Sequence, residues 1–282
     1  MEQEKFELYN DHAIKLISYY LNNMEKSITE EEVKQVCSCG VAEEFAVNLL
    51  LANHLDIDNE EFSRMYFSNM VELVDREEIE NNAYFKNIKF PTVVDGEWEF
   101  KMGEYAPFEI FVKNDFKIEG KKITPDLGYF NEKFTFPAVY QNGRMWMSVS
   151  PNEINTMQHN IAYARGKVVT FGLGLGYFAY MCSLKSEVTS ITIIEKNEKV
   201  IELFNKYILP QFEAKDKITI VKADAYEYIK SLKDGEFDYA FVDIYHDAGD
   251  GVEVYLNFHD TIKEYKRTKF EFWIEKSIRF YV

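Results

Sequence analysis

Hydrophobic residues recur with helical spacing in the first part of the chain. Tyr9, Ala13, Ile17 and Tyr20 lie three or four positions apart and therefore share one face of a helix. Further amphipathic runs open with capping-box signatures, in which an acid follows a Thr or Asp by three positions. These signatures stand at residues 29–32, 58–61 and 75–78. The pattern predicts an acidic helical domain over residues 1–88.

After residue 88 the pattern of hydrophobic residues changes to short apolar runs, which are typical of strands. Residues 134–140 and 144–149 are apolar-rich and are separated by an Asn-Gly turn, which is typical of a two-residue hairpin. Residues 117–123 have a similar pattern around Gly120. We therefore expect a small β-hairpin region over residues 89–150. A capping box at residues 150–153, with Pro151 at the first helical position, predicts a helix that follows it.

The remaining residues, 151–282, alternate between apolar strands and helical runs. The strand at residues 168–171 runs directly into Gly172, Gly174 and Gly176. Three later strands each end in an acidic residue: Glu195, Asp224 and Asp243. Parallel strands that alternate with helices form a doubly wound sheet, which binds ligands at the carboxyl ends of its strands. Glycines there let bare backbone approach a nucleotide-like ligand, and strand-end acids can accept its ribose hydroxyls.

This combination resembles the class I S-adenosylmethionine-dependent methyltransferases over residues 150–276. The resemblance implies a Rossmann-like domain with strand order 3-2-1-4-5 and S-adenosylmethionine as the cofactor. It also implies the binding residues: Gly172, Gly174 and Gly176 at the methionine end, Glu195 at the ribose, Asp224 with Ala225 at the adenine, and Asp243 facing the active site. Thr170 departs from the family, which has an acid two residues before the first glycine.

The resemblance also bears on the far edge of the sheet. A fifth strand is predicted at residues 269–275, and the few residues after it are too short for the hairpin that usually completes this sheet. We therefore expect an incomplete edge, which the N-terminal domains or the second subunit of a homodimer would cover.

Candidate catalytic residues follow the fourth strand: Asp243, His246 and Asp247. Histidine can act as a base near neutral pH, and either carboxylate could orient it or hold an amine. The alternative is that residues 247–251 form an ordinary turn before a helix. The spacing of acids predicts no metal site. The resulting hypothesis is a methyltransferase that acts on a small molecule or a protein side chain.

Other functions fit part of the pattern. Polyamine synthases are similar in the β region and the Rossmann-like domain, use decarboxylated S-adenosylmethionine, and keep a catalytic Asp shortly after the fourth strand. Here the interval from Asp243 to Asp247 is one residue longer than their Asp-x-x-Asp. A dinucleotide fits the glycines and Glu195 but gives Asp224 and Asp243 no role. The sequence is also compatible with a protein that binds S-adenosylmethionine without catalysing a reaction.

Composition restricts the partners. The net charge of the 282-residue chain is −16, and residues 1–85 alone hold 19 acidic and 6 basic residues. Nucleic-acid binding needs a basic stripe to neutralise phosphates, and the sequence has none, so nucleic acid is not expected as a substrate. No apolar run reaches the roughly 20 residues of a membrane span. The first residues lack the basic start and apolar core of a signal peptide, so we expect a cytoplasmic enzyme.

Overall fold

A computed structural model describes residues 3–23, 28–57, 60–67, 70–120 and 122–282. The chain forms two compact units, residues 1–78 with 104–135 and residues 79–103 with 136–282. This division differs from the expected domains at residues 1–88, 89–150 and 151–282. Two continuous strands, β3 (Trp98–Tyr105) and β6 (Phe134–Gln141), carry the chain from one unit into the other. No linker of distinctive composition therefore marks the boundary.

The first unit combines helices with a three-stranded sheet. Its sheet has the order β1-β5-β4, in which β5 pairs parallel with β1 and antiparallel with β4. The core joins both kinds of element, because Ala13, Val47 and Phe62 of the helices are buried with Leu127 of the central strand. The elements are α1 (Gln3–Asn23), α2 (Glu30–Cys37), α3 (Glu43–His54), α4 (Glu60–Phe67), β1 (Val71–Leu73), β4 (Phe111–Glu119) and β5 (Lys122–Tyr129). Helix α5 (Arg76–Glu80) leads into the second unit.

The predicted capping boxes have different outcomes. Thr29 caps α2, and Glu32 bonds back to the backbone N–H of Thr29, which completes the box. At the third signature, Asp75 accepts a hydrogen bond from the backbone N–H of Glu77. The signature at residues 58–61 begins outside the described residues.

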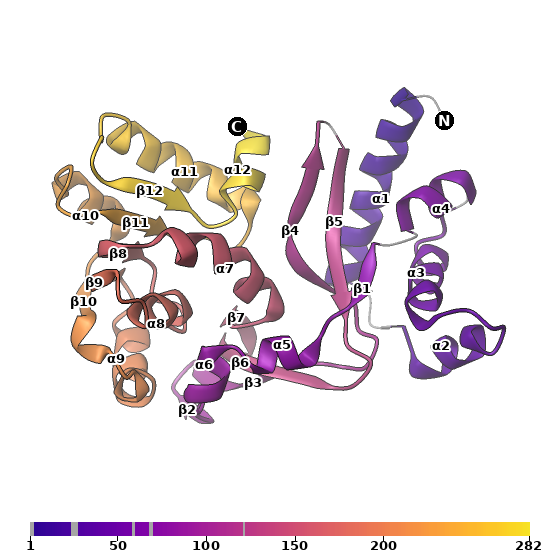
Figure 1. Cartoon of the computed structure of the whole chain (residues 1–282), viewed down its shortest axis with the longest axis horizontal. Helices are drawn as coiled ribbons and strands as arrows, with labels where there is room; N and C mark the ends of the chain where they lie inside the picture. Colours follow the sequence, from indigo (N-terminus) through magenta and orange to yellow (C-terminus); the bar gives the residue numbers. More distant parts are fainter. Residues whose placement is uncertain (1–2, 24–27, 58–59, 68–69, 121) are drawn as a thin grey trace. The chain divides into compact units, whose positions relative to one another are not determined.

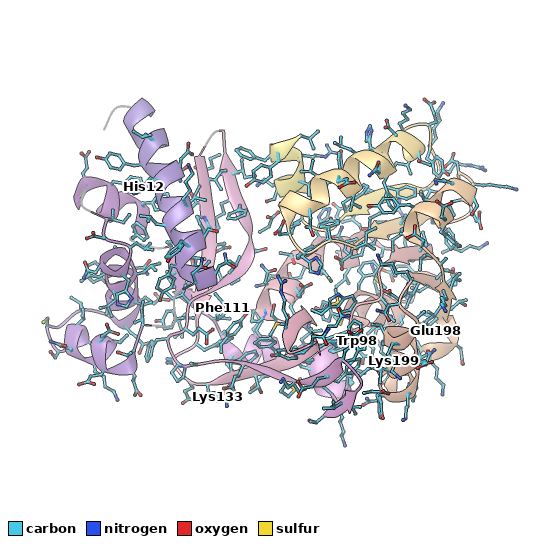
Figure 2. All side chains as sticks on the ribbon, turned by 180° about the vertical axis from the view of Figure 1, so that it is seen from behind. His12, Trp98, Phe111, Lys133, Glu198 and Lys199 are labelled. Carbon is cyan, nitrogen blue, oxygen red and sulfur yellow. The ribbon has the colours of Figure 1, made fainter. Side chains whose placement is uncertain are left out.

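The second unit begins with α6 (Ala83–Asn87) and a small antiparallel sheet of order β2-β3-β6-β7. Strands β2 (Val93–Asp95) and β7 (Arg144–Ser148) are its edges. The hairpin between β6 and β7 turns at Asn142 and Gly143, whose φ angles of 51° and 77° are those of a two-residue primed turn. Figure 2 labels Lys199 and Trp98, which lies on strand β3. The ammonium nitrogen of Lys199 in α9 (Glu198–Tyr207) lies 2.8 Å from a carboxylate oxygen of Asp95 in β2 and forms an ion pair with it. The small sheet is thereby joined to the Rossmann-like part of the same unit.

Five parallel strands form the main sheet of the second unit, in the order β10-β9-β8-β11-β12. Figure 1 shows strands and helices alternating from β8 to the yellow C-terminal helix. Its elements are α7 (Pro151–Tyr163), β8 (Gly166–Phe171), α8 (Tyr177–Ser183), β9 (Val188–Glu195), α9 (Glu198–Tyr207), β10 (Ile218–Lys222), α10 (Ala225–Ser231), β11 (Tyr239–Val242), α11 (Ala248–Ile262), β12 (Lys269–Phe272) and α12 (Glu275–Tyr281). Two short 3₁₀ turns, Leu209–Gln211 and Lys215–Lys217, precede β10.

The prediction of a Rossmann-like α/β fold is confirmed. The strands are almost wholly apolar because helices bury both faces of a parallel sheet, and Val168, Ile193 and Phe241 have no exposed surface. The fifth strand is shorter than predicted, since β12 stops at Phe272 and Glu275 begins a helix. Glu275 accepts a hydrogen bond from the backbone N–H of Phe272, the last residue of the strand, at 3.2 Å. Among the described residues, no helix combines the length and apolar character needed to cross a membrane.

Candidate active site

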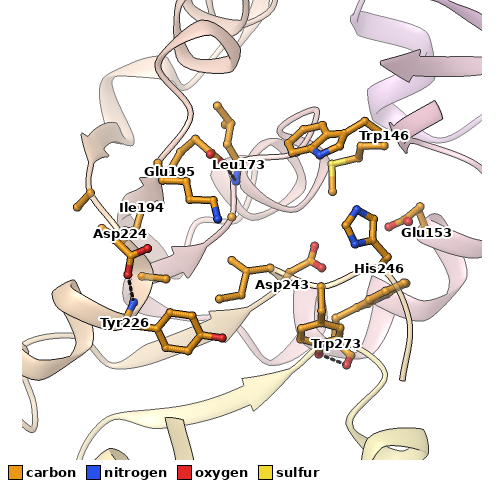
Figure 3. A pocket seen from close by; sticks show the side chains of 18 residues that line it. Trp146, Glu153, Leu173, Ile194, Glu195, Asp224, Tyr226, Asp243, His246 and Trp273 are labelled. Carbon is orange, nitrogen blue, oxygen red and sulfur yellow. Dashed lines mark hydrogen bonds between the residues drawn. The ribbon is translucent and has the colours of Figure 1, made fainter. Parts of the chain in front are cut away.

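A cavity of about 280 Å³ lies at the carboxyl ends of the central strands of the second unit (Figure 3). The glycine loop after β8, the ends of β9, β10 and β11, and the hairpin strand β7 all contribute to it. The lining residues are Trp146, Met147, Glu153, Gly172, Leu173, Gly174, Ile194, Glu195, Lys196, Ala223, Asp224, Ala225, Tyr226, Asp243, Ile244, Tyr245, His246 and Trp273. This is the edge at which sheets of this kind bind ligands.

Gly172, Gly174 and Gly176 all adopt positive φ angles, of 101°, 53° and 75°. A Cβ on Gly172 would collide with the backbone oxygen of Asp243, and one on Gly174 would collide with the sulfur of Met147. Gly172 and Gly174 line the cavity, whereas Gly176 caps α8 and packs against Phe204. Only the first two predicted glycines therefore offer backbone to a ligand in the cavity.

Glu195 is the last residue of β9, and its side chain is hydrogen bonded to the glycine loop. One carboxylate oxygen accepts the backbone N–H of Leu173 at 3.2 Å, and the other accepts that of Asn197 at 2.7 Å. The residue is only 7% exposed and lines the cavity. A carboxylate oxygen has two acceptor positions, so Glu195 can hold the loop and still accept a ligand hydroxyl.

Asp224 and Ala225 lie at the start of α10. Asp224 caps this helix by accepting the backbone N–H groups of Tyr226 and Glu227 at 2.9 and 3.2 Å through one oxygen. Both Asp224 and Ala225 line the cavity. The structure thus brings the predicted glycines, Glu195, Asp224 and Ala225 to one edge of the sheet.

Glu153 is a cavity residue that the sequence analysis assigned to a helix cap. Ser150 does precede α7, but its side chain makes no capping bond, so the expected box does not form. Glu153 instead faces the cavity, where Figure 3 places it on the same side as Asp243 and His246. No local sequence signal distinguishes this role, because the same residue types and spacing make a valid capping box.

Glu153 and Asp243 are partly accessible from the cavity but otherwise enclosed by protein. Burial raises the pKa of Asp243 to about 7. Burial, and after it the nearby charge of Asp243, raises the pKa of Glu153 well above its usual range. Two acids in one enclosed site resist ionising together, so the pair keeps a proton to a higher pH than an isolated carboxyl group does.

His246 and Asp247 follow β11 and have different surroundings. His246 lines the cavity with a side chain that is 69% exposed, and its Nδ1 lies 3.2 Å from Asp250. Burial disfavours the charged form of Asp250, but hydrogen bonds from the backbone of Asp247 and His246 outweigh it and lower the pKa of Asp250. Asp247 does not belong to the cavity lining. It caps α11 by accepting the N–H groups of Gly249 and Asp250 at 2.7 and 3.1 Å.

Two tryptophans that the sequence analysis did not name complete the wall. Trp146 of β7 packs edge-on against Trp98, with ring centroids 5.2 Å apart. Trp273 donates its indole N–H to Thr156 of α7 at 2.8 Å, and its backbone oxygen accepts the hydroxyl of Tyr245. The cavity therefore combines aromatic walls with four acidic side chains and a single lysine, Lys196. Such a lining favours cations.

Comparison with known proteins identifies one family. Residues 172–266 match the model of the spermine/spermidine synthase domain. Comparison with curated protein sequences gave no match. The chain therefore has a fold of the class I S-adenosylmethionine-dependent methyltransferase type, with similarity to polyamine synthases.

Several solved structures are also similar. Spermidine synthase from Thermotoga maritima is 19% identical over 46% of this chain and 50% of its own, with a TM-score of 0.33. A spermidine synthase in complex with the transition-state analogue AdoDATO is 18% identical over 52% and 58%, with a TM-score of 0.35. A conserved hypothetical protein from Streptococcus pyogenes is 21% identical over 36% and 61%, with a TM-score of 0.29. The chain thus spans about half to three fifths of these structures, and likenesses of this size do not bear on function.

The family match corrects the function predicted from the sequence. The methyltransferase prediction is wrong, because the stretch that carries Gly172, Glu195, Asp224 and Asp243 matches the spermine/spermidine synthase domain. The two families differ little in these residues, since both bind an adenosyl sulfonium at the same edge of the same fold. The glycine turn and the strand-end acids therefore could not distinguish them.

Proposed function

We propose that the chain is an aminopropyltransferase of the polyamine-synthase type, which transfers the aminopropyl group of decarboxylated S-adenosylmethionine to an amine. The observation that carries the proposal is the match of residues 172–266 to the spermine/spermidine synthase domain, which contains most of the acidic cavity. Decarboxylated S-adenosylmethionine bears a sulfonium and an ammonium group, and the acceptor amine is also a cation near neutral pH. Glu153, Glu195, Asp224 and Asp243 suit such ligands.

The residues around the cavity fit the donor. Gly172 and Gly174 leave room where a Cβ would collide with neighbouring atoms, so backbone can approach the donor there. Glu195 would accept the ribose hydroxyls, and Asp224 beside Ala225 would bind at the adenine. When bound, the donor supplies a carbon that its sulfonium activates for displacement.

Transfer needs a base, because an amine that arrives as an ammonium ion has no lone pair for attack. The amine nitrogen attacks the aminopropyl carbon, the carbon–sulfur bond breaks, and the electron pair leaves with sulfur as a neutral thioether. Asp243, whose pKa is raised to about 7 by burial, is the residue we propose to accept the proton. Burial and the charge of Asp243 raise the pKa of Glu153 beside it, and we propose that the protonated form of Glu153 donates a hydrogen bond in the transfer step. The remaining work is positioning of the two reactants in line.

His246 and Asp247 have lesser parts in this proposal. The second acid of the polyamine-synthase pattern would fall on Asp247 only with one extra residue, and Asp247 is occupied as the cap of α11. His246 lies at the open side of the cavity with Asp250 as its partner. We propose that it assists release of the proton to solvent.

The direct test supplies the full chain with decarboxylated S-adenosylmethionine and a panel of primary amines and diamines. We expect mass spectrometry to detect an aminopropylated amine together with methylthioadenosine in equal amounts. Asp243→Asn should slow this transfer by about 100-fold or more and keep donor binding, as measured by calorimetry. S-Adenosylmethionine serves as the matched donor control and should give no product. Tight binding of decarboxylated S-adenosylmethionine without transfer to any amine would contradict the enzymatic proposal and favour a binding protein.

A further inference from the structure

A short segment from the region predicted to be helical packs onto the glycine loop within the second unit. This segment, residues 82–87, is called the α6 clip below. It makes three hydrogen bonds to residues more than 90 positions later. Asn82 donates to the hydroxyl of Tyr177 at 2.9 Å, Tyr84 donates to the backbone oxygen of Leu175 at 2.7 Å, and Asn87 donates to the hydroxyl of Tyr180 at 2.8 Å.

Tyr84 is the central residue of the α6 clip. Its side chain is fully buried, and its ring packs edge-on against those of Tyr177 and Tyr180 at centroid distances of 5.7 and 5.6 Å. Burial raises the pKa of Tyr84, so its hydroxyl remains a neutral donor throughout the ordinary pH range. Tyr84 does not line the cavity and can influence a ligand only through the loop that it holds.

Backbone hydrogen bonds at Gly172 and Gly176 shape the glycine loop, and two side chains hold it further, one on each side of Gly174. Glu195 accepts the backbone N–H of Leu173, and Tyr84 donates to the backbone oxygen of Leu175. Three glycines with positive φ give this stretch many alternative conformations, since glycine has few steric restrictions. The hydrogen bonds at Leu173 and Leu175 therefore stabilise the observed conformation of the loop, in which Gly174 lines the cavity.

We infer that Tyr84 is a positioning residue, which fixes the glycine loop in the conformation that receives the donor. The identity of the donor rests on the proposed function, whereas the effect on the loop does not. A loop held in advance loses less conformational freedom when a ligand binds, so loss of the Tyr84 hydroxyl should weaken donor binding. In the proposed function Asp243 and not the glycine loop acts on the acceptor, so acceptor binding and the rate of transfer should change little.

The test compares Tyr84→Phe with Tyr66→Phe. Tyr66 is a matched control, because it is a buried tyrosine of the first unit whose hydroxyl is hydrogen bonded to Asn10. We expect Tyr84→Phe to raise the KM for the donor about 3- to 10-fold, the scale of one hydrogen bond. Its kcat and its KM for the amine should stay within about twofold of wild type. Tyr66→Phe should change none of the three constants.

Hydrogen exchange provides a second readout that does not depend on activity. Amide exchange at Leu173, Gly174 and Leu175 should become faster in Tyr84→Phe and stay unchanged in Tyr66→Phe. If no transfer occurs with any amine but exchange accelerates as expected, the proposed function fails and the positioning role stands. Unchanged exchange in the loop, or a donor KM equal to that of wild type, would overturn the inference.

Discussion

Four carboxylates line one cavity, and their surroundings divide them into two kinds. Glu195 and Asp224 accept hydrogen bonds from backbone N–H groups. Asp243 and Glu153 have pKa values raised by burial and lie close enough for the charge of one to affect the other. Carboxylic acids whose pKa values are raised by burial in a cavity are characteristic of acid–base chemistry. The residue type alone does not distinguish the two kinds.

The rate of transfer should rise with pH to a plateau above about pH 7, because Asp243 must lose its proton before it can act as a base. Asp243→Asn should lower kcat by about 100-fold or more, the usual contribution of a general base. Glu153→Gln imitates the protonated acid and should stay within about threefold of wild type at pH 7. Steady-state rates from pH 5.5 to 9 would measure all three. Equal losses in both variants would contradict the division of roles.

The thermal stability of Asp243→Asn shows whether its loss of activity comes from damage to the fold. The folded pKa of Asp243 is above its unfolded value of about 4, so ionisation destabilises the folded state progressively as pH rises from about 4 to 7. Removing the charge should therefore raise the Tm at pH 8, by at least about 2 °C, and change it much less at pH 4.5. A lower Tm at pH 8 would mean that the loss of activity reflects damage to the fold.

At the scale of elements, the start of α11 determines where the loop after β11 can lie. Asp247 and Asp250 form a reciprocal capping box, and Asp250 also accepts the backbone N–H of His246. The acids in this segment therefore hold the loop through backbone groups. The sequence is compatible with both a catalytic Asp247 and an ordinary turn, and the observed hydrogen bonds are those of a turn that opens a helix.

Substitution of Asp247 separates a capping role from a catalytic one. Serine is a good N-cap but not a carboxylate, so Asp247→Ser should keep both the Tm and the rate of transfer near those of wild type. Asp247→Ala removes the cap and should cost about 1 kcal/mol of stability. Thermal unfolding and steady-state kinetics of the two variants provide the comparison. A 100-fold slower Asp247→Ser enzyme with an unchanged Tm would assign Asp247 to catalysis instead.

At the scale of the whole molecule, charge favours small cationic partners. The net charge is −16, and most of the excess lies in residues 1–85. An anionic chain of this kind attracts amines at long range and repels nucleic acid. We propose that the acceptor is a small amine and that DNA and RNA are neither substrates nor inhibitors.

The salt dependence of the KM for an amine should reveal this electrostatic attraction. Raising the salt concentration from 50 to 500 mM screens charges beyond a few ångströms, so the KM for a diamine should rise several-fold. The kcat should change less than twofold, because the enclosed reaction site is screened little. A monoamine of similar length is the matched control and should show a smaller rise in KM. Equal salt dependence for the two amines would contradict an electrostatic contribution to acceptor binding.

The sequence by itself determined the Rossmann-like sheet and the strand-end position of the candidate site. Apolar runs, the glycine turn at Gly172 and the acids Glu195, Asp224 and Asp243 are local features, and parallel strands necessarily bring their carboxyl ends to one edge. The start of a helix could also be predicted where a side chain bonds to backbone only a few residues away, as Thr29 does at the start of α2. The family could not be distinguished in this way, since two related chemistries use the same residues.

Only the tertiary structure decided which side chains meet across long distances in sequence. Glu153 and Asp243 are 90 positions apart in the sequence, and Tyr84 and Leu175 are 91 positions apart. Their proximity results from how helices and strands pack, which no local spacing encodes. Burial, and with it the raised pKa of Asp243, likewise exists only after folding, because a carboxylate in the unfolded chain is in water. Two of the boundaries between the units fall within strands β3 and β6, whose composition contains no boundary signal.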